Sequence, residues 1–128
     1  MPKRTNDFQE LITKIYKQLA APDETITPSA IVRERENGTE REIDILLKKK
    51  VFGTTISIAV ECRGRSDKDD IQWMDELIGK YRDLPINKVV AVSKSGFTQA
   101  AEEKARANRI DPLTLIAALE TNWPNEFV

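Results

Sequence analysis

The sequence contains no histidine and only one cysteine, Cys62. Without histidine the chain lacks the commonest general base and metal ligand, and a single cysteine excludes an internal disulfide and a multi-cysteine zinc site. Histidine-based catalytic triads and zinc hydrolase motifs are therefore excluded. Proton and metal chemistry has to come from carboxylates, lysine, arginine, tyrosine and hydroxyl groups, and oxygen ligands favour a hard cation such as magnesium.

The chain also lacks an excess of charge of one sign and a long hydrophobic run. Twenty Lys and Arg residues against 21 Asp and Glu residues give a formal net charge of −1. Bulk charge therefore does not mark a nucleic-acid or membrane-surface protein. No run approaches the roughly 18 apolar residues of a membrane span, and residues 1–7 have no signal-peptide core. We expect a cytoplasmic protein without a membrane partner, built as one domain over residues 1–128.

Hydrophobic periodicity predicts alternating helices and strands. Helical spacing occurs in residues 8–19, 69–84 and from 97 or 98 to about 108. Strand patterns occur at 25–35 (an irregular or edge strand), 41–47, 56–63, 88–92 and, as a possible last strand, 112–115. The element order αβββαβα, with an optional final β, predicts an α/β (α+β) fold with a central mixed β-sheet flanked by helices.

The predicted strands 41–47 and 56–63 form a hairpin with an alternating pattern. Ile43, Ile45 and Leu47 are predicted to share one face of the first strand. The lysine run 48–50 and the following Phe52 and Gly53 interrupt the alternation, so we expect them in the connection. Lysines at a hairpin tip usually keep a loop in solution and protect sheet edges, although phosphate contacts are also possible there.

Two carboxylates on these paired strands form the main candidate site. Asp44 lies on the first strand, and Glu61 and Arg63 project from one face of the second. If the hairpin brings Asp44 and Glu61 together they repel, and a divalent cation bound by both would relieve the repulsion while leaving room for water and phosphate oxygens. Arg63 could clamp a phosphate. The pattern indicates hydrolysis of a phosphodiester bond.

Four segments carry a family resemblance: residues 8–12 (FQELI), 40–45 (EREIDI), 60–63 (VECR) and 88–101 (KVVAVSKSGFTQAA). They resemble the PD-(D/E)xK nuclease superfamily, specifically the Mrr-like restriction endonuclease group. The resemblance implies a restriction-endonuclease-like fold, DNA as substrate, and magnesium, with manganese possible, as cofactor. It implies a metal-dependent endonuclease with a restriction, defence or processing role.

The resemblance also assigns roles by position. Asp44 and Glu61 resemble the two metal-binding acids of the family, and Cys62 would offer its main-chain carbonyl to the metal. Glu10 matches the acidic residue that many members carry in the first helix.

Arg63 stands where the family has its catalytic lysine. Lysine can accept a proton when its environment favours the neutral amine, whereas arginine stays protonated and can only orient groups and stabilise charge. Lys80 is a possible substitute, because it shares a helical stripe with Gln72 and Glu76 at four-residue spacing. The competing interpretations are a structural ion pair for Arg63 and an exposed helix surface for Lys80.

The leading hypothesis is a magnesium-dependent DNA endonuclease. Because one small domain with a net charge of −1 should hold DNA weakly, we expect a homodimer or a partner domain that supplies target recognition. The alternative, favoured by Arg63, is a catalytically inactive member of the fold that serves as a DNA-binding or protein-interaction module. A third possibility is a processing enzyme that acts on RNA or on nucleic-acid ends.

Overall fold

The computed structural model describes residues 6–120 of the chain. The elements in order are α1 Asp7–Leu19, β1 Thr25–Arg33, β2 Glu40–Val51, β3 Thr54–Arg63, α2 Ile71–Tyr81, β4 Lys88–Ser93, α3 Gln99–Ala107, β5 Ile110–Thr114 and α4 Leu115–Glu120. The strands form one sheet in the order β1-β2-β3-β4-β5. The pairs β1–β2 and β2–β3 are antiparallel, and β3–β4 and β4–β5 are parallel. The expected mixed sheet is confirmed.

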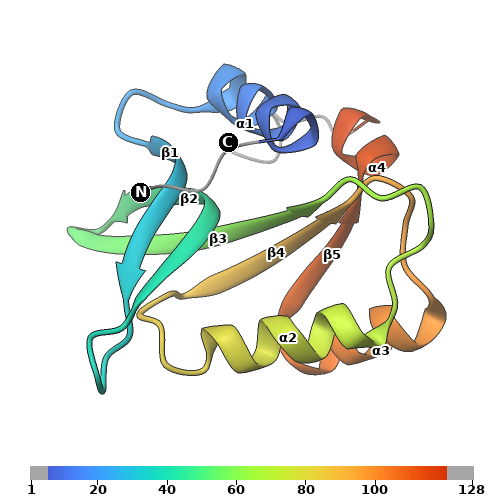
Figure 1. Ribbon diagram of the computed structural model, residues 1–128. Helices are drawn as coiled ribbons and strands as arrows, with labels where there is room; N and C mark the ends of the chain where they lie inside the picture. Colours follow the sequence, from blue (N-terminus) through green and yellow to red (C-terminus); the bar gives the residue numbers. More distant parts are fainter. Residues whose placement is uncertain (1–5, 121–128) are drawn as a thin grey trace.

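Helices cover both faces of this sheet (Figure 1). Helices α1 and α4 lie on one face, and α2 and α3 lie on the other. Polar side chains fix where the long helices begin: Asn6, Asp70 and Thr98 each accept a hydrogen bond from a main-chain N–H in the first turn of α1, α2 and α3. Such caps satisfy N–H groups that have no partner inside the helix. Among residues 6–120, no helix is both long and apolar enough to cross a lipid bilayer.

The two faces bury separate parts of the core. On the α1 face, Ile12 and Tyr16 pack against Ile45, Val60 and Val92. On the other face, α2 and α3 pack against β4 and β5 through a cluster of Trp73, Met74, Leu77, Val89, Ala91, Phe97, Ala101, Ala105 and Ile110. The sheet is thus buried between two helical layers, as expected of strands with near-continuous apolar runs.

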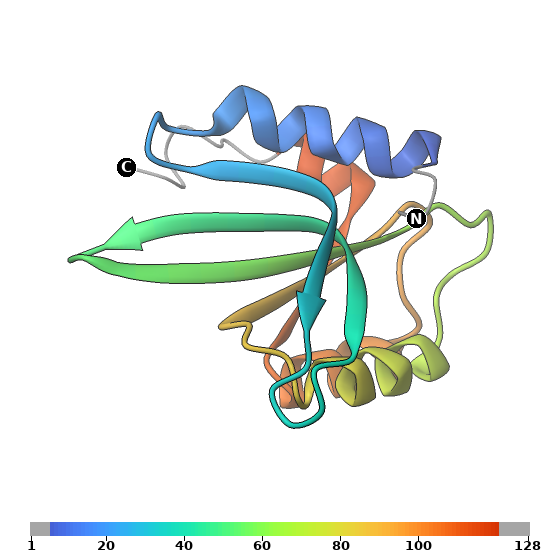
Figure 2. The same ribbon diagram turned by 60° about the vertical axis from the view of Figure 1, so that its left-hand side comes forward.

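The structure corrects the predicted face of Ile43. Ile43 packs with Leu46, Ala59 and Leu84 rather than with Ile45. The reason is a bend: the β2–β3 ladder stops at the pair Ile45 and Val60, and the first part of β2 curves away with β1 (Figure 2). Strict alternation holds only along a regularly twisted strand, so it fails across the bend.

The end of β2 also differs from the prediction. Lys48, Lys49 and Lys50 lie within β2 and pair with β3. Only Phe52 and Gly53 form the turn, both with positive φ. Lysine in a strand keeps its main-chain hydrogen bonds, so a lysine run interrupts the hydrophobic pattern without ending the strand.

The C-terminal part has more regular structure than the sequence predicts. Strand β5 begins at Ile110, two residues before the predicted possible strand, and α4 was not predicted. Six residues are too few to show a helical hydrophobic period. The aromatic residues Trp123 and Phe127, which are candidates for docking or a partner contact, lie outside the described residues.

Candidate active site

Asp44 and Glu61 meet where β2 and β3 separate. The regular ladder ends with Ile45 opposite Val60, and one further step in the same register places Asp44 opposite Glu61. There the Asp44 carboxylate replaces the next ladder bond, since its Oδ2 accepts a hydrogen bond from the main-chain N–H of Cys62 at 2.8 Å. The two predicted acids are therefore neighbours, fixed by the strand register and by the bend.

Glu61 is only 6% exposed. Its Oε2 atom accepts hydrogen bonds from the Lys80 ammonium, at 2.7 Å, and from the Tyr81 hydroxyl. Burial raises the pKa of Glu61; the Lys80 charge lowers it, and the Asp44 charge raises it. Because a buried carboxylate is costly unless it is paired, Lys80 and Tyr81 are the groups that allow Glu61 to be ionised at this place.

Lys80 reaches Glu61 from α2. Besides Glu61, its ammonium donates to the main-chain oxygen of Glu42 on β2. An ammonium has three donors, so within the described part of the chain one remains for a ligand. Lys80 and Glu76 are four residues apart on α2, about 6 Å, and Glu61 and Arg63 are two apart on β3, about 6.6 Å. The similar spacings let Lys80 contact Glu61 and Glu76 contact Arg63 when α2 runs antiparallel to β3.

Arg63, at the family's lysine position, points to other partners. Its guanidinium lies 3.6 Å from an oxygen of Asp69 and 3.5 Å from Glu76, and it stacks 4.9 Å above the Trp73 ring. Trp73 in turn stacks on Phe97. Arg63 thus covers an aromatic pair, and its ion-pair partners are Asp69 and Glu76 rather than Asp44 or Glu61.

Asp69 is the buried acid beneath Arg63. Its side chain is fully buried; Oδ2 accepts a hydrogen bond from Ser93, and Oδ1 has no hydrogen-bond partner among the described residues. The main chain of Asp69 bonds with Gly96 and Thr98. Asp69 therefore ties the segment after β3 to the turn after β4, and Arg63 is its only charged neighbour in the part of the chain that the structure describes.

In α1, Gln9 reaches the main chain of the site. Gln9 is 3% exposed, and its side-chain amide donates to the main-chain oxygen of Asp44 at 2.8 Å and to the Ser29 hydroxyl at 3.2 Å. Glu10 is exposed and borders a surface hollow with Lys14 and other α1 residues. A role for Glu10 in the site stays a prediction, whereas Gln9 holds the main chain of Asp44 in its bend.

The site offers oxygen donors to a hard cation. Among residues 6–120, Asp44 Oδ1 and Glu61 Oε1 have no hydrogen-bond partner, and no group of three or more Asp, Glu or Cys side chains comes together as a metal cluster. Two carboxylates fit magnesium, which retains waters and takes substrate phosphate oxygens. Burial raises the pKa of the Cys62 thiol, so Cys62 could contribute only its main-chain carbonyl.

Sequence patterns missed Gln9, Asp69 and Tyr81. Gln9 and Tyr81 are each one residue away from a predicted site residue, and the hydrophobic period does not fix the rotation of a helix to better than one position. The buried Asp69 sits before the N-cap of α2, where an acid is ordinarily read as part of a helix start.

The chain matches a known protein family over most of its length. The sequence model of a family described as "Restriction endonuclease" (Mrr_cat) matches residues 4–120. The chain therefore belongs to this Mrr-type restriction endonuclease family, and membership supports a nuclease-type function. A comparison with curated protein sequences gives no match.

Solved structures share the fold at low sequence identity. The structure of AF1548, a protein of unknown function, matches with a TM-score of 0.71 and 14% identity over 88% of this chain and 63% of that one. The DNA modification-dependent restriction endonuclease AspBHI gives 0.61 and 13%, over 88% and 29%. The MspJI restriction endonuclease in complex with a 27-mer oligonucleotide gives 0.56 and 9%, over 92% and 29%. The chain thus spans less than two thirds of each.

Proposed function

We propose that the chain is a divalent-metal-dependent endonuclease that hydrolyses phosphodiester bonds of DNA. Magnesium is the expected ion, and manganese is expected to substitute for it. The proposal is supported by membership of the restriction endonuclease family, by the paired carboxylates Asp44 and Glu61, and by fold similarity to an endonuclease solved with an oligonucleotide.

The observation that carries the proposal is the contact between Lys80 and Glu61 at 2.7 Å. Lysine is missing from its usual place on β3, where Arg63 stands. Lys80 supplies an ammonium beside the same carboxylate from α2, and it is 17% exposed, so a ligand can reach it. A chain that had kept the fold only for packing would need neither a buried carboxylate at Glu61 nor the cation that pairs with it, since burying charge is costly.

Each residue then has a distinct role. Asp44, Glu61 and the Cys62 carbonyl would hold the metal, which when bound would lower the pKa of a water and offset charge on the scissile phosphate. Lys80 would donate its remaining N–H to a phosphate oxygen or to the attacking water, stabilising negative charge as the bond breaks. Tyr81 and Gln9 would be positioning residues, acting through Glu61 and Asp44. Arg63 would position the segment after β3 rather than touch the reacting atoms.

Target recognition would come from a second copy or from another domain. The solved restriction endonucleases that share the fold are longer than this chain, and the net charge of −1 gives weak general attraction to DNA. We therefore propose a homodimer or a partner domain that brings the site to its target.

The test is nicking of supercoiled plasmid by the purified chain in magnesium, manganese or EDTA. We expect nicking with either metal and none in EDTA. Asp44→Asn and Glu61→Gln should each lower the rate at least about 100-fold. Asp75→Asn is the matched control, because Asp75 is an exposed acid on α2 that pairs with Lys104 on α3. The nicking rate of this variant should equal that of wild type.

Two outcomes would contradict the proposal. Metal-independent nicking that survives Asp44→Asn would show that the carboxylates are not the site. Duplex binding without cleavage in any metal would favour the inactive DNA-binding module. Competition by single-stranded DNA and RNA in the same assay separates a duplex endonuclease from a processing enzyme.

A further inference from the structure

The hairpin of β2 and β3 extends beyond the rest of the sheet (Figure 2). The β1 strand pairs with β2 only up to Lys48, and β4 pairs with β3 only from Ile58 onward. Between these limits the two strands pair only with each other, down to Val51 opposite Thr54. The result is a two-stranded ribbon whose outer end, residues 50–55, is exposed throughout.

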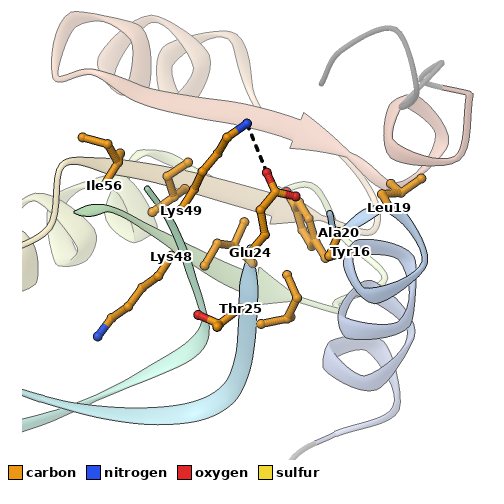
Figure 3. A pocket seen from close by; sticks show the side chains of 11 residues that line it. Tyr16, Leu19, Ala20, Glu24, Thr25, Lys48, Lys49 and Ile56 are labelled. Atoms are coloured by element: carbon orange, nitrogen blue, oxygen red, sulfur yellow. Dashed lines mark ion pairs between the residues drawn. The ribbon is translucent and has the colours of Figure 1, made fainter. Parts of the chain in front are cut away.

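This ribbon carries positive charge without any acid of its own. Residues 48–58 (KKKVFGTTISI) contain three lysines and no Asp or Glu, in a chain whose net charge is −1. Lys49 turns to the α1 face, where it pairs with Glu24 at 3.2 Å (Figure 3). Lys48 points the other way and away from this pair. Lys48 and Lys50 have no ion-pair partner among the described residues.

The tip holds a fully exposed aromatic ring in a strained main-chain conformation. Phe52 is 104% exposed, and its φ is 51°, followed by Gly53 with φ of 79°. Two positive φ values are typical of a type I′ hairpin turn, which prefers Asn-Gly. A bulky residue with positive φ is disfavoured, and such strain at an exposed position that packs against nothing points to a function for the side chain.

The free lysines lie on the face of the ribbon that carries the candidate site. Along the regular ladder Lys48 and Lys50 alternate with Lys49 and lie opposite Ser57 and Thr55, which share one face of β3 with Glu61. These partners lie about 13 and 20 Å from Glu61 along β3, at about 3.3 Å per residue. This span corresponds to roughly four to six base pairs of duplex DNA.

We propose that the ribbon grips double-stranded DNA, with Lys48 and Lys50 on backbone phosphates and the Phe52 ring inserted at a base step in a groove. β-Ribbons bind in the minor as well as the major groove, and apolar side chains act as wedges between base steps in the minor groove, which is where the Phe52 ring would enter. The choice of duplex DNA rests on the proposed function, but the positive charge and the strained aromatic residue stand independently of catalysis. The ribbon would supply duplex affinity that the overall charge does not.

The experiment measures binding of the full chain to a labelled 25-base-pair duplex in EDTA, so that cleavage plays no part. Lys48→Gln/Lys50→Gln should weaken binding about tenfold at low salt and reduce the slope of log K against log salt by about two. The matched control is Lys14→Gln/Lys17→Gln, which removes the same charge from exposed positions of α1 on the opposite face. Its affinity should stay within about twofold of wild type.

Phe52 is tested by two substitutions. Phe52→Asn should weaken binding about tenfold and yet raise Tm by about 2–4 °C, because asparagine suits the turn. Phe52→Trp should keep wild-type affinity. Weaker binding together with a higher Tm would exclude misfolding as the cause of the lost affinity.

Several results would overturn the inference. They are absence of duplex binding by wild type, equal affinities of all variants, an equal loss in the α1 control, or a Phe52→Asn effect confined to the oligomeric state. Nicking that persists with ribbon-independent binding would leave the proposed function standing and remove this inference. Ribbon-dependent binding without nicking would do the reverse.

Discussion

Two cations, Lys80 on α2 and Arg63 on β3, lie near the same end of β3 and have different partners. Lys80 contacts the buried Glu61 at 2.7 Å and faces the paired carboxylates. Arg63, two positions along the same strand, stands 3.5–3.6 Å from Glu76 and Asp69 and covers Trp73. Arg63 therefore occupies the lysine position of the motif but packs on Trp73. The cation beside Glu61 is Lys80, which comes from α2.

The difference shows that a motif position in the sequence does not by itself identify the cation nearest to Glu61. Lys80, four residues after Glu76 on α2, supplies the ammonium beside Glu61. The strand residue Arg63 pairs with Glu76 instead.

The largest effect is expected from moving the lysine back to β3. The double variant Lys80→Met/Arg63→Lys should nick plasmid about 100- to 1000-fold more slowly than wild type, because a lysine at 63 would still face Asp69 and Glu76. Circular dichroism should show an unchanged fold. Recovery of wild-type rate by this variant would mean that the β3 position does reach the carboxylates.

Removing the acid under Arg63 should affect stability more than activity. Asp69→Asn leaves Arg63 without its buried partner, and we expect the free energy of unfolding to fall by about 1–3 kcal/mol, with nicking reduced less than tenfold. Urea unfolding measures the change. The control Asp75→Asn, at an exposed ion pair, should change it by less than about 0.5 kcal/mol. Equal effects of both variants would contradict a buried role for Asp69.

Tyr81 should set the acid limit of activity. Its hydroxyl stabilises ionised Glu61 and so lowers the pKa of Glu61, against the larger rise caused by burial. In Tyr81→Phe the pKa of Glu61 rises further, so the carboxylate is protonated at higher pH and metal-dependent nicking should fall off earlier as the pH is lowered. At alkaline pH the two rates should converge. Superimposable pH–rate profiles would contradict the positioning role.

The smallest effect is expected from Arg63→Lys alone. A lysine keeps the charge near Asp69 and Glu76 but loses the stacking on Trp73, which is worth about 0.5–1 kcal/mol. We expect nicking within about threefold of wild type and a slightly lower Tm. A large gain in activity would show instead that arginine attenuates the native protein.

The sequence predicts the strand pair and its carboxylates well. Alternation along two strands is a local property, so Asp44 and Glu61 could be placed together before the structure was known. The approach of Lys80 was visible as a stripe with Glu76, but helical spacing alone does not say which strand residues the stripe will face.

The parts of the site that the sequence does not predict depend on contacts between segments far apart in the chain. Gln9 and Asp44 are 35 residues apart, and Ser93 and Asp69 are 24 apart. The bend at Asp44 and the rotation of α1 bring the Gln9 side chain to this main chain. A hydrophobic period predicts neither the bend at Asp44 nor the rotation of α1, because both arise only when the helices pack on the sheet.

The most direct test compares Lys80→Met with Arg63→Met in single-turnover nicking of supercoiled plasmid with magnesium. If the helix cation serves the carboxylates, Lys80→Met loses at least about 100-fold and Arg63→Met stays within about tenfold of wild type. A severe loss in Arg63→Met, with Lys80→Met near wild type, would contradict the account.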